Sequence, residues 1–408
     1  MKRITCFLIA LLFISTTVFS RPQYSILQSF GVKCINCHVN AQGGGARNNQ
    51  GWLSRKDISL INPTSIGLGK FYDVVASTDQ FLKDKFTFGF DYRLQSARFG
   101  VFSKSDRETF TMQATPYLAY NPTDWLMLEG QANLAYFLIK DHRYIGQESH
   151  AYSADFKFSD NLPRLRIGYF QPTIGTKYDD HTLLVREVAT YYGNIPLIPD
   201  DYAEFGAQLD YDPYEWVSCN LGVFSSKELS VMTSPDGYTG KQIPVVDSDI
   251  PSIALRLAFF PTLGHGINTF MGGTFFFNSG FNLNSKGAYF SNNYFYISSL
   301  FFHIGLSDNL ALMMEYMRSV KENSQTTNNV MAELTYQLKE SVLPYFRIER
   351  AMTKEVFQNS KYNTDQYVLG VHIYLLPFID LLPEYRIYNR EFIPGYATQW
   401  AFQLHLFY

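Results

Sequence analysis

The sequence predicts an all-β fold, a transmembrane barrel of about sixteen antiparallel strands preceded by a small N-terminal segment. Segments of about ten residues alternate between apolar and polar side chains, as strands do when one face meets lipid and the other meets water. Charged residues make up only 17% of the 408 residues, and aromatic residues another 17%. After residue 20 no run reaches the ~20 consecutive apolar residues that a membrane helix needs. The pattern therefore excludes a helical membrane protein and favours a barrel.

The N-terminal stretch, residues 1–20, has the parts of a secretory signal peptide. Lys2 and Arg3 form a charged start, residues 6–18 are apolar, and a small residue stands at the end. We expect cleavage ahead of Arg21 and export of the mature chain. Export puts the remaining cysteines in an oxidising compartment, where disulfides form and where c-type haems are attached.

Cys34, Cys37 and His38 follow one another in the order C-x-x-C-H, which is the attachment signature of a c-type haem. Thiols at this spacing add across the two vinyl groups of one porphyrin, and the adjacent imidazole ligates the iron from one face. We expect one covalent haem c, attached through Cys34 and Cys37, with His38 as an axial iron ligand. A disulfide followed by an incidental histidine is the other interpretation. Cys219 alternates with apolar neighbours and is expected to face lipid.

Glycines occupy residues 43–45, shortly after the motif, and Arg47 follows them. Glycine lets a backbone pass close to a flat macrocycle, and Arg47 could pair with a haem propionate. A flexible linker is the other interpretation of the glycines.

The second axial position of the haem has no obvious local ligand, because residues 21–84 contain no histidine besides His38 and no methionine. The position could be open, or a lysine or the new amino terminus could fill it. A histidine of the barrel is the third option, and the candidates are His181, His372 and His405.

Residues 86–94 illustrate the alternation, since every even-numbered side chain is apolar and every odd-numbered one is polar or glycine. The same period predicts strands throughout the rest of the chain. They lie near residues 85–95, 108–120, 125–138, 150–159, 164–172, 202–212, 216–225, 252–261, 266–277, 293–305, 309–318, 329–339, 342–351, 366–376, 380–390 and 397–408. A soluble β-sandwich also shows alternation, but it needs neither so many strands nor so little charge.

Tight turns alternate with longer loops along the predicted barrel. Turns are expected to face the periplasm and loops the outside, which puts both termini on the periplasmic side. The last predicted strand ends on Tyr408, with apolar side chains at every second position before it. This ending resembles the sorting signal of bacterial outer-membrane barrels. We therefore expect the chain to lie in a bacterial outer membrane, in contact with its lipid.

The predicted lumen face is rich in charge. Its charged residues are Asp91, Arg93, Glu129, Arg164, Arg166, Glu204, Asp210, Arg347, Glu349, Glu384, Arg386 and Arg390. A barrel of this size normally encloses an aqueous channel, and we expect these side chains to be solvated without a specific task. The net charge of −3, with no basic cluster or phosphate-binding loop, predicts no nucleic-acid partner.

The connection between the fifth and sixth predicted strands, residues 172–203, is too long for a turn. Loops longer than ~12–15 residues are usually functional or disordered, and this one combines prolines and aromatic residues with few disorder-promoting runs. We expect it to fold back into the lumen as a constriction. Asp179, Asp180 and His181 within it could ligate a metal, and a turn or cap is the other interpretation of these residues.

The chain thus divides into a signal peptide (residues 1–20), a monohaem cytochrome c-like segment (21–84) and a barrel (85–408). The lipid band of such a barrel is ~25 Å tall and tunnelling decays steeply with distance, so we expect the middle segment to plug the lumen. This combination resembles the fused cytochrome–porins of the bacterial outer membrane, a family that includes the outer-membrane iron oxidases. The specific motif that carries the resemblance is CINCH, residues 34–38.

The resemblance implies that the chain carries single electrons between the cell exterior, where ferrous iron is a candidate donor, and periplasmic carriers such as soluble cytochromes. An iron oxidase-like oxidoreductase would be the enzyme form of this activity. The direction of electron flow and the association into homo-oligomers, such as porin trimers, stay open. Two other functions fit the same residues. One is a diffusion porin or solute channel with a structural or sensory plug, and the other is a haem enzyme such as a peroxidase, which needs a distal acid–base histidine.

Overall fold

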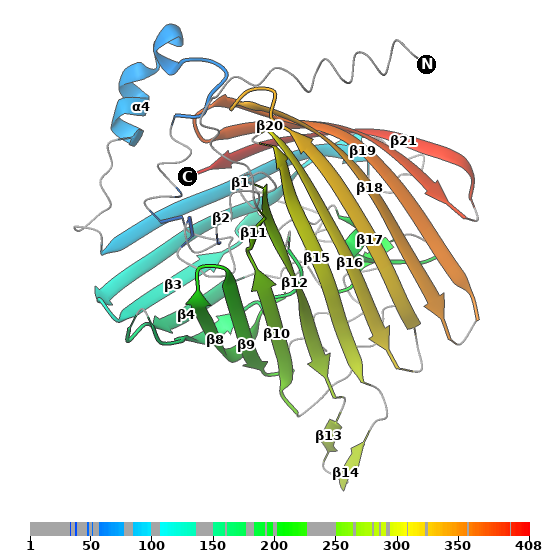
Figure 1. Ribbon diagram of the computed structural model, residues 1–408. Helices are drawn as coiled ribbons and strands as arrows, with labels where there is room; N and C mark the ends of the chain where they lie inside the picture. The colour runs from blue at the N-terminus through cyan, green and yellow to red at the C-terminus, as the bar shows by residue number, and fades with distance from the viewer. Residues whose placement is uncertain are drawn as a thin grey trace.

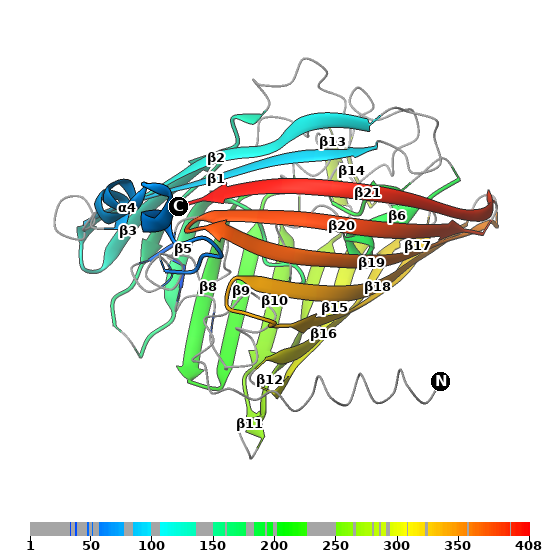
Figure 2. The ribbon, with the colours of Figure 1, turned by 90° about the horizontal axis from the view of Figure 1, so that it is seen from above.

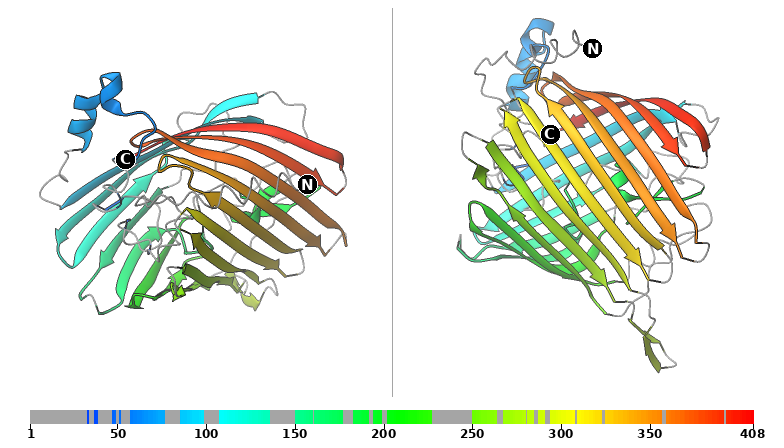
Figure 3. Two further views of the ribbon diagram at one scale, coloured as in Figure 1. Left: turned by 45° about the horizontal axis from the view of Figure 1, so that its top comes forward. Right: turned by 45° about the vertical axis from the view of Figure 1, so that its right-hand side comes forward.

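The computed structural model describes residues 33, 37–38, 47–48, 51, 57–76, 85–98, 107–135, 150–159, 161–176, 183–191, 194–198, 202–226, 250–263, 267–279, 281–284, 287–290, 294–307, 309–322, 325–356, 359–391 and 393–408. In this part of the chain one sheet has 17 strands, and all but the two-residue strand β11 (Thr262–Leu263) are staves that pair antiparallel with a neighbour on each side. The first and last staves pair with each other, which closes a barrel of sixteen staves (Figures 1 and 3).

The staves follow one another around the barrel in chain order. They are β1 (Phe86–Arg98), β2 (Arg107–Thr123), β3 (Leu126–Ala132), β4 (His150–Phe156), β5 (Arg164–Phe170), β8 (Glu204–Tyr214), β9 (Val217–Phe224), β10 (Ser252–Phe259), β12 (Ile267–Asn278), β15 (Phe295–Ser307), β16 (Leu310–Lys321), β17 (Gln325–Tyr336), β18 (Val342–Glu355), β19 (Lys361–Leu376), β20 (Ile379–Arg390) and β21 (Ile393–Phe407). Each of them overlaps a predicted strand, so the predicted fold class and strand number are confirmed.

Shorter elements do not form part of the ring of staves. They are the 3-10 helices η2 (Pro63–Ile66) and η4 (Leu184–Arg186), the helix α4 (Gly69–Ala76), and the strand pairs β6 (Glu187–Ala189) with β7 (Asn194–Pro196) and β13 (Phe281–Asn284) with β14 (Gly287–Phe290). No helix in the described ranges is long and apolar enough to cross a membrane.

The third predicted strand was too long, since it was expected to reach residue 138 whereas β3 ends at Ala132. The reason is Asn133, whose Oδ1 accepts hydrogen bonds from the backbone N–H groups of Ala114 and Ala135 at 3.0 Å each. The Asn133 side chain thus takes the place of the backbone carbonyl group that would accept these hydrogen bonds in a continuing strand. Conversely, β17 and β19 begin several residues earlier than predicted, because their first residues are polar on both faces and show no alternation.

Side chains alternate along each stave between a buried inner face and an exposed outer face. On β17, Val330 and Leu334 point outward and are 41% and 40% exposed, whereas Asn329 and Glu333 point inward and are 0% and 4% exposed. This distribution, with apolar residues outside and polar residues inside, is the reverse of the distribution in a water-soluble protein. Only a lipid surrounding stabilises that distribution, so the wall is a transmembrane barrel.

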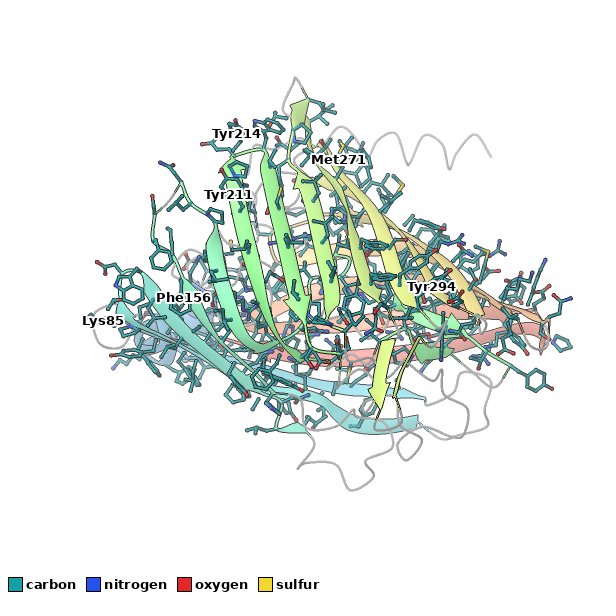
Figure 4. All side chains as sticks on the ribbon, turned by 90° about the horizontal axis from the view of Figure 1, so that it is seen from below. Lys85, Phe156, Tyr211, Tyr214, Met271 and Tyr294 are labelled. Atoms are coloured by element: carbon teal, nitrogen blue, oxygen red, sulfur yellow. The ribbon has the colours of Figure 1, made fainter. Side chains whose placement is uncertain are left out.

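Aromatic side chains gather at the ends of the staves, next to the turns. Near one rim the ring of Trp125 stacks on Phe156 and Phe158 at centroid distances of 6.3 and 6.1 Å, and Tyr214 stacks on Trp216 at 5.5 Å. Figure 4 shows Phe156, Tyr211 and Tyr214 on this part of the wall. Such girdles mark the two membrane–water interfaces.

The two ends of the barrel differ in the length of their connections. Turns at residues 124–125, 215–216 and 377–378 join staves at one end, whereas the long connections, such as residues 225–251 between β9 and β10, lie at the other. Short turns face the periplasm in barrels of this kind. Helix α4 and the C terminus lie at the short-turn end (Figure 1), which is therefore the periplasmic end, as the sequence predicts.

Leu369 tests the lipid-facing assignment, because it points outward from the middle of β19 and is 60% exposed. We expect Leu369→Arg to lower the free energy of unfolding by about 2–4 kcal/mol, the cost of a cation at the bilayer midplane. Leu338, 57% exposed at the periplasmic rim after β17, gives the matched control, and Leu338→Arg is expected to cost about 0–1 kcal/mol. Denaturant titration in lipid vesicles measures both values. Equal losses would contradict the assignment.

Candidate functional site

Lys33, directly before the predicted haem motif, anchors the N-terminal segment to the periplasmic turn between β8 and β9. Its Nζ donates to the carbonyl oxygens of Tyr214 and Val217 at 2.9 Å each and pairs with the Asp212 carboxylate at 3.3 Å. The ammonium also lies 5.8 Å from the ring centre of Phe260. The start of the motif is thus held at the rim of the barrel.

The backbone of Cys37 and His38 is contacted by Arg47, Asn48 and Gly51. His38 and Arg47 form an isolated antiparallel bridge. The backbone N–H of Asn48 donates to the Cys37 carbonyl at 3.0 Å, and its side chain reaches the His38 carbonyl at 3.4 Å. A Cβ at Gly51 would lie 2.0 Å from the Cys37 carbonyl oxygen, so this close approach needs glycine there. Cys37 and His38 are both half-buried.

Arg47 contacts the opposite part of the rim, at the seam where the barrel closes. Its guanidinium lies 4.8 Å from the ring centre of Phe407, and Phe407 on β21 is the register partner of Asp91 on β1. The predicted pairing of Arg47 with a haem propionate stays a prediction. The contact places Arg47, the bridge partner of His38, against the inner wall of the barrel.

Ile58 is a further anchor of the N-terminal segment and is only 1% exposed. It packs into an apolar cluster at the periplasmic end of the lumen, whose other members include Leu343, Tyr374, Phe378 and Phe407. Two residues later the backbone of the segment joins β19, since the N–H of Leu60 donates to the Tyr374 carbonyl at 2.7 Å. The described part of the predicted plug thus lies at the periplasmic mouth.

Two histidine–aspartate pairs line the inner wall next to this segment. His372 Nδ1 lies 2.7 Å from Asp380 Oδ2, and His405 Nε2 lies 2.7 Å from Asp91 Oδ1. Arg93 adds an ion pair to Asp91 at 3.3 Å. The sequence prediction included both histidines but missed Asp380. The two-residue turn at 377–378 was the available signal, since a tight hairpin brings positions on either side of it together.

The lumen charges differ from the prediction, because they are paired and buried rather than solvated. Arg347, 2% exposed, reaches three carboxylates, at 3.3 Å to Glu333, 3.1 Å to Glu349 and 3.7 Å to Glu384. Arg386 pairs with Glu384 as well. The cause is strand geometry: side chains two apart share a face, and the register sets Glu333 directly opposite Arg347. The lumen wall of β17–β20 is therefore a fixed ion network.

A similar network occupies the far side of the lumen. Arg166 on β5 pairs with Glu129 and donates to Ser153 at 2.9 Å, and its guanidinium lies 4.1 Å from the Phe170 ring centre. Asp210 accepts hydrogen bonds from Gln208 at 2.7 Å and from Asn220 at 2.5 Å. These charges too are held by neighbouring side chains of the inner wall.

The long connection between β5 and β8 folds into the lumen, which confirms the predicted constriction for its described residues. Its apolar side chains Leu183, Val185 and Val188 are fully buried in a cluster with inward-facing residues of the wall. Elements η4 and β6 contact β16, β17, β18 and β19 across the lumen (Figure 2). The loop therefore spans from one side of the barrel to the other.

Asn329 and Glu349 hold this constriction loop at its far end. Asn329 Nδ2 reaches the carbonyl oxygens of Leu184, Val185 and Glu187 at 3.1, 3.0 and 2.6 Å. Glu349, the partner of Arg347, accepts a hydrogen bond from the Leu184 N–H at 2.9 Å. Glu349 was predicted only as a lumen charge and Asn329 was not predicted, because a contact between a loop and a distant strand leaves no local pattern.

Several predicted residues lie outside the described ranges. They are residues 1–20, Cys34, the glycines 43–45, Asp179, Asp180 and His181. Among the described residues no group of three histidine, cysteine or acidic side chains is arranged to hold a metal ion. Cys219 is half-buried and lies on the same face of β9 as the outward-facing Leu221 and Val223, which agrees with its predicted lipid-facing position.

Comparison with solved structures supports the barrel. The structure is similar to OmpT of Vibrio cholerae (TM-score 0.51, 12% identity, 81% of this chain and 100% of that chain) and to Salmonella typhi OmpF in complex with daunomycin (0.54, 10%, 79% and 97%). It is also similar to Pseudomonas putida OprB (0.50, 9%, 85% and 97%). No protein-family model and no curated protein matches the chain. The chain has the closed β-barrel fold of these outer-membrane proteins.

Asn329 provides a test of the constriction loop. We expect Asn329→Ala to loosen the loop by about 1–3 kcal/mol, because three carbonyl groups lose their donor, and to speed amide exchange in residues 183–191 by about 5–150-fold. Hydrogen–deuterium exchange with mass spectrometry measures this. Asn328→Ala is the matched control, since Asn328 faces outward and bonds Tyr316. Unchanged exchange in the Asn329 variant would show that the loop is held by other contacts.

Arg347 provides a test of the ion network. Arg347→Met leaves buried carboxylates without their shared cation, and we expect it to lower the free energy of unfolding by about 3–5 kcal/mol. The control is Arg350→Met on the same stave, whose partner Asp365 lies on the outer face at 2.5 Å and whose loss is expected to cost less than about 1 kcal/mol. Denaturant titration compares the two. A cost for Arg347→Met as small as that of the control would mean that the lumen charges are solvated.

Proposed function

We propose that this protein carries one haem c on Cys34, Cys37 and His38 at the periplasmic mouth of its barrel and passes single electrons between the cell exterior and periplasmic carriers. The anchoring of the motif segment carries the proposal. Lys33 bonds the β8–β9 turn on one side, and Arg47 packs on Phe407 on the other. A segment without a task at the mouth would not need attachment at both ends.

The residues present fit such a haem. Two thiols and an adjacent imidazole are the donor set that covalent attachment requires. Cys37 and His38 lie side by side with their carbonyl oxygens bonded by Asn48, and the glycine at position 51 keeps a side chain away from the Cys37 carbonyl. A bound haem c supplies a one-electron redox centre whose potential depends on axial ligands, burial and hydrogen bonding.

The position of the motif favours a small soluble partner on the outer side. The lipid band is ~25 Å tall, and the described part of the motif segment lies at its periplasmic end. A partner that stays outside the cell is therefore too far away for direct exchange, whereas a small ion can enter the lumen. The constriction loop lies across this route. Aqueous ferrous iron is a donor of suitable size, and soluble cytochromes can approach the open periplasmic side.

A diffusion channel is the second candidate function. The fold shared with outer-membrane barrels such as OmpF and the charged inner wall favour it. Ion conductance of the purified barrel in a planar bilayer separates the two functions. A low conductance is expected for a lumen filled by the loop and the N-terminal segment, and a high conductance would favour the channel.

An absorption spectrum of the purified, detergent-solubilised protein tests the proposed function. We expect a covalent c-type spectrum that ferrous iron reduces and that is lost in Cys37→Ala. Reduction by dithionite alone would keep the cytochrome but remove ferrous iron as the donor. A wild-type protein without haem after expression with a cytochrome maturation system would overturn the proposal in favour of the channel.

A further inference from the structure

The inner wall next to the motif segment carries a row of histidine and aspartate side chains on consecutive staves. His372 lies on β19, Asp380 on β20, His405 on β21 and Asp91 on β1. Asp380 is the register partner of His405 and accepts its hydrogen bond from His372, so the row is continuous across the closing seam. Both carboxylates are buried, at 3% and 6% exposed. They therefore fix the orientation of the imidazoles that they contact.

The two histidines use different ring nitrogens in these hydrogen bonds. His372 bonds Asp380 through Nδ1, the nitrogen next to its Cβ, so that Nε2 at the far end of the ring is left over. His405 bonds Asp91 through Nε2 and keeps only the nitrogen nearer its own backbone. A histidine that ligates a metal through one nitrogen usually donates the other N–H to a carboxylate, which orients the ring and raises its basicity. In His372 this leaves Nε2, the nitrogen farther from the backbone, for the metal.

The N-terminal segment also joins β19 two residues from His372. Tyr374, two residues along the same face, accepts the backbone hydrogen bond from Leu60 and packs against Phe407 at a centroid distance of 6.2 Å. The Phe407 ring in turn contacts the guanidinium of Arg47, which is the bridge partner of His38. The contacts of Arg47 and Leu60 therefore meet at Phe407 and Tyr374. This part of the wall holds both His372, whose side chain is 21% exposed, and His405, whose ring centre lies 5.0 Å from that of Phe407. The ring nitrogen that each histidine leaves for a metal is what favours His372.

From this arrangement we propose that His372 supplies the second axial ligand to the haem on Cys34, Cys37 and His38, with Asp380 as its positioning residue. This inference rests on the proposed function, because it requires the covalent haem. It assigns the ligand to the barrel wall rather than to the long lumen loop or to the N-terminal segment. The barrel would then hold the haem from the face opposite His38.

The spin state of the purified ferric protein tests the assignment by electron paramagnetic resonance and absorption spectroscopy. The wild type is expected to be low-spin, because two nitrogen ligands bind the iron. His372→Asn is expected to be high-spin while it keeps the covalent haem, since the Asn amide can still donate to Asp380 but does not ligate haem iron well. Added imidazole should restore the low-spin form. His405→Gln, which retains a donor for Asp91, is the matched control and is expected to stay low-spin.

His372→Met adds a readout that a merely structural role would not move. A thioether in place of the second imidazole raises the reduction potential of a c-type haem, so a redox titration of this variant is expected to show a higher midpoint than the wild type. A low-spin His372→Asn variant, a high-spin wild type, or a spin change in His405→Gln alone would each overturn the assignment. Haem staining of a denaturing gel separates the two proposals: haem without the spin change refutes His372 alone, and no covalent haem refutes both.

Discussion

The absence of water from the lipid core is the constraint on which the rest of this structure depends. Each backbone N–H and C=O group in that layer needs a partner within the chain, and a closed sheet supplies one for every stave. Strands β1 and β21 pair with each other and close the barrel. Tyr408 contributes to this seam, since Tyr408 and Phe90 exchange backbone hydrogen bonds at 2.8 and 3.2 Å. Tyr408 thus extends the seam beyond the pair of Asp91 and Phe407.

Closure also decides where polar side chains can go. The outer face must be apolar, so charge collects on the inner face, where successive inward residues and register partners lie within ion-pair distance. Glu333 faces Arg347 in this way, and Glu349 extends the same network to the backbone of the constriction loop. Buried ion pairs are weak sources of net stability but strong determinants of geometry, because an unpaired partner is costly. The network thus fixes the loop across the lumen.

The N-terminal segment depends on the barrel for its position. Its own described elements are the short helices η2 and α4, which are too small to form a core of their own. Ile58 instead uses the apolar cluster at the periplasmic end of the lumen, and Lys33 uses carbonyl oxygens at a turn. The rim of the barrel thus positions the described residues around the C-x-x-C-H motif, and this placement links the fold to the proposed electron transfer.

The sequence by itself determined the class of fold, the number of staves and the face of each residue, because a period of two and a lipid boundary are local properties that composition records. It also predicted haem attachment at Cys34, Cys37 and His38, because the C-x-x-C-H signature is a property of residue order. Only the tertiary structure decided which charges pair, that Asn329 holds the constriction loop, and that His372 and His405 meet Asp380 and Asp91 beside the motif segment. Those contacts join residues that are far apart in the chain or on different staves, and they follow from register and closure, which no single stretch of sequence contains.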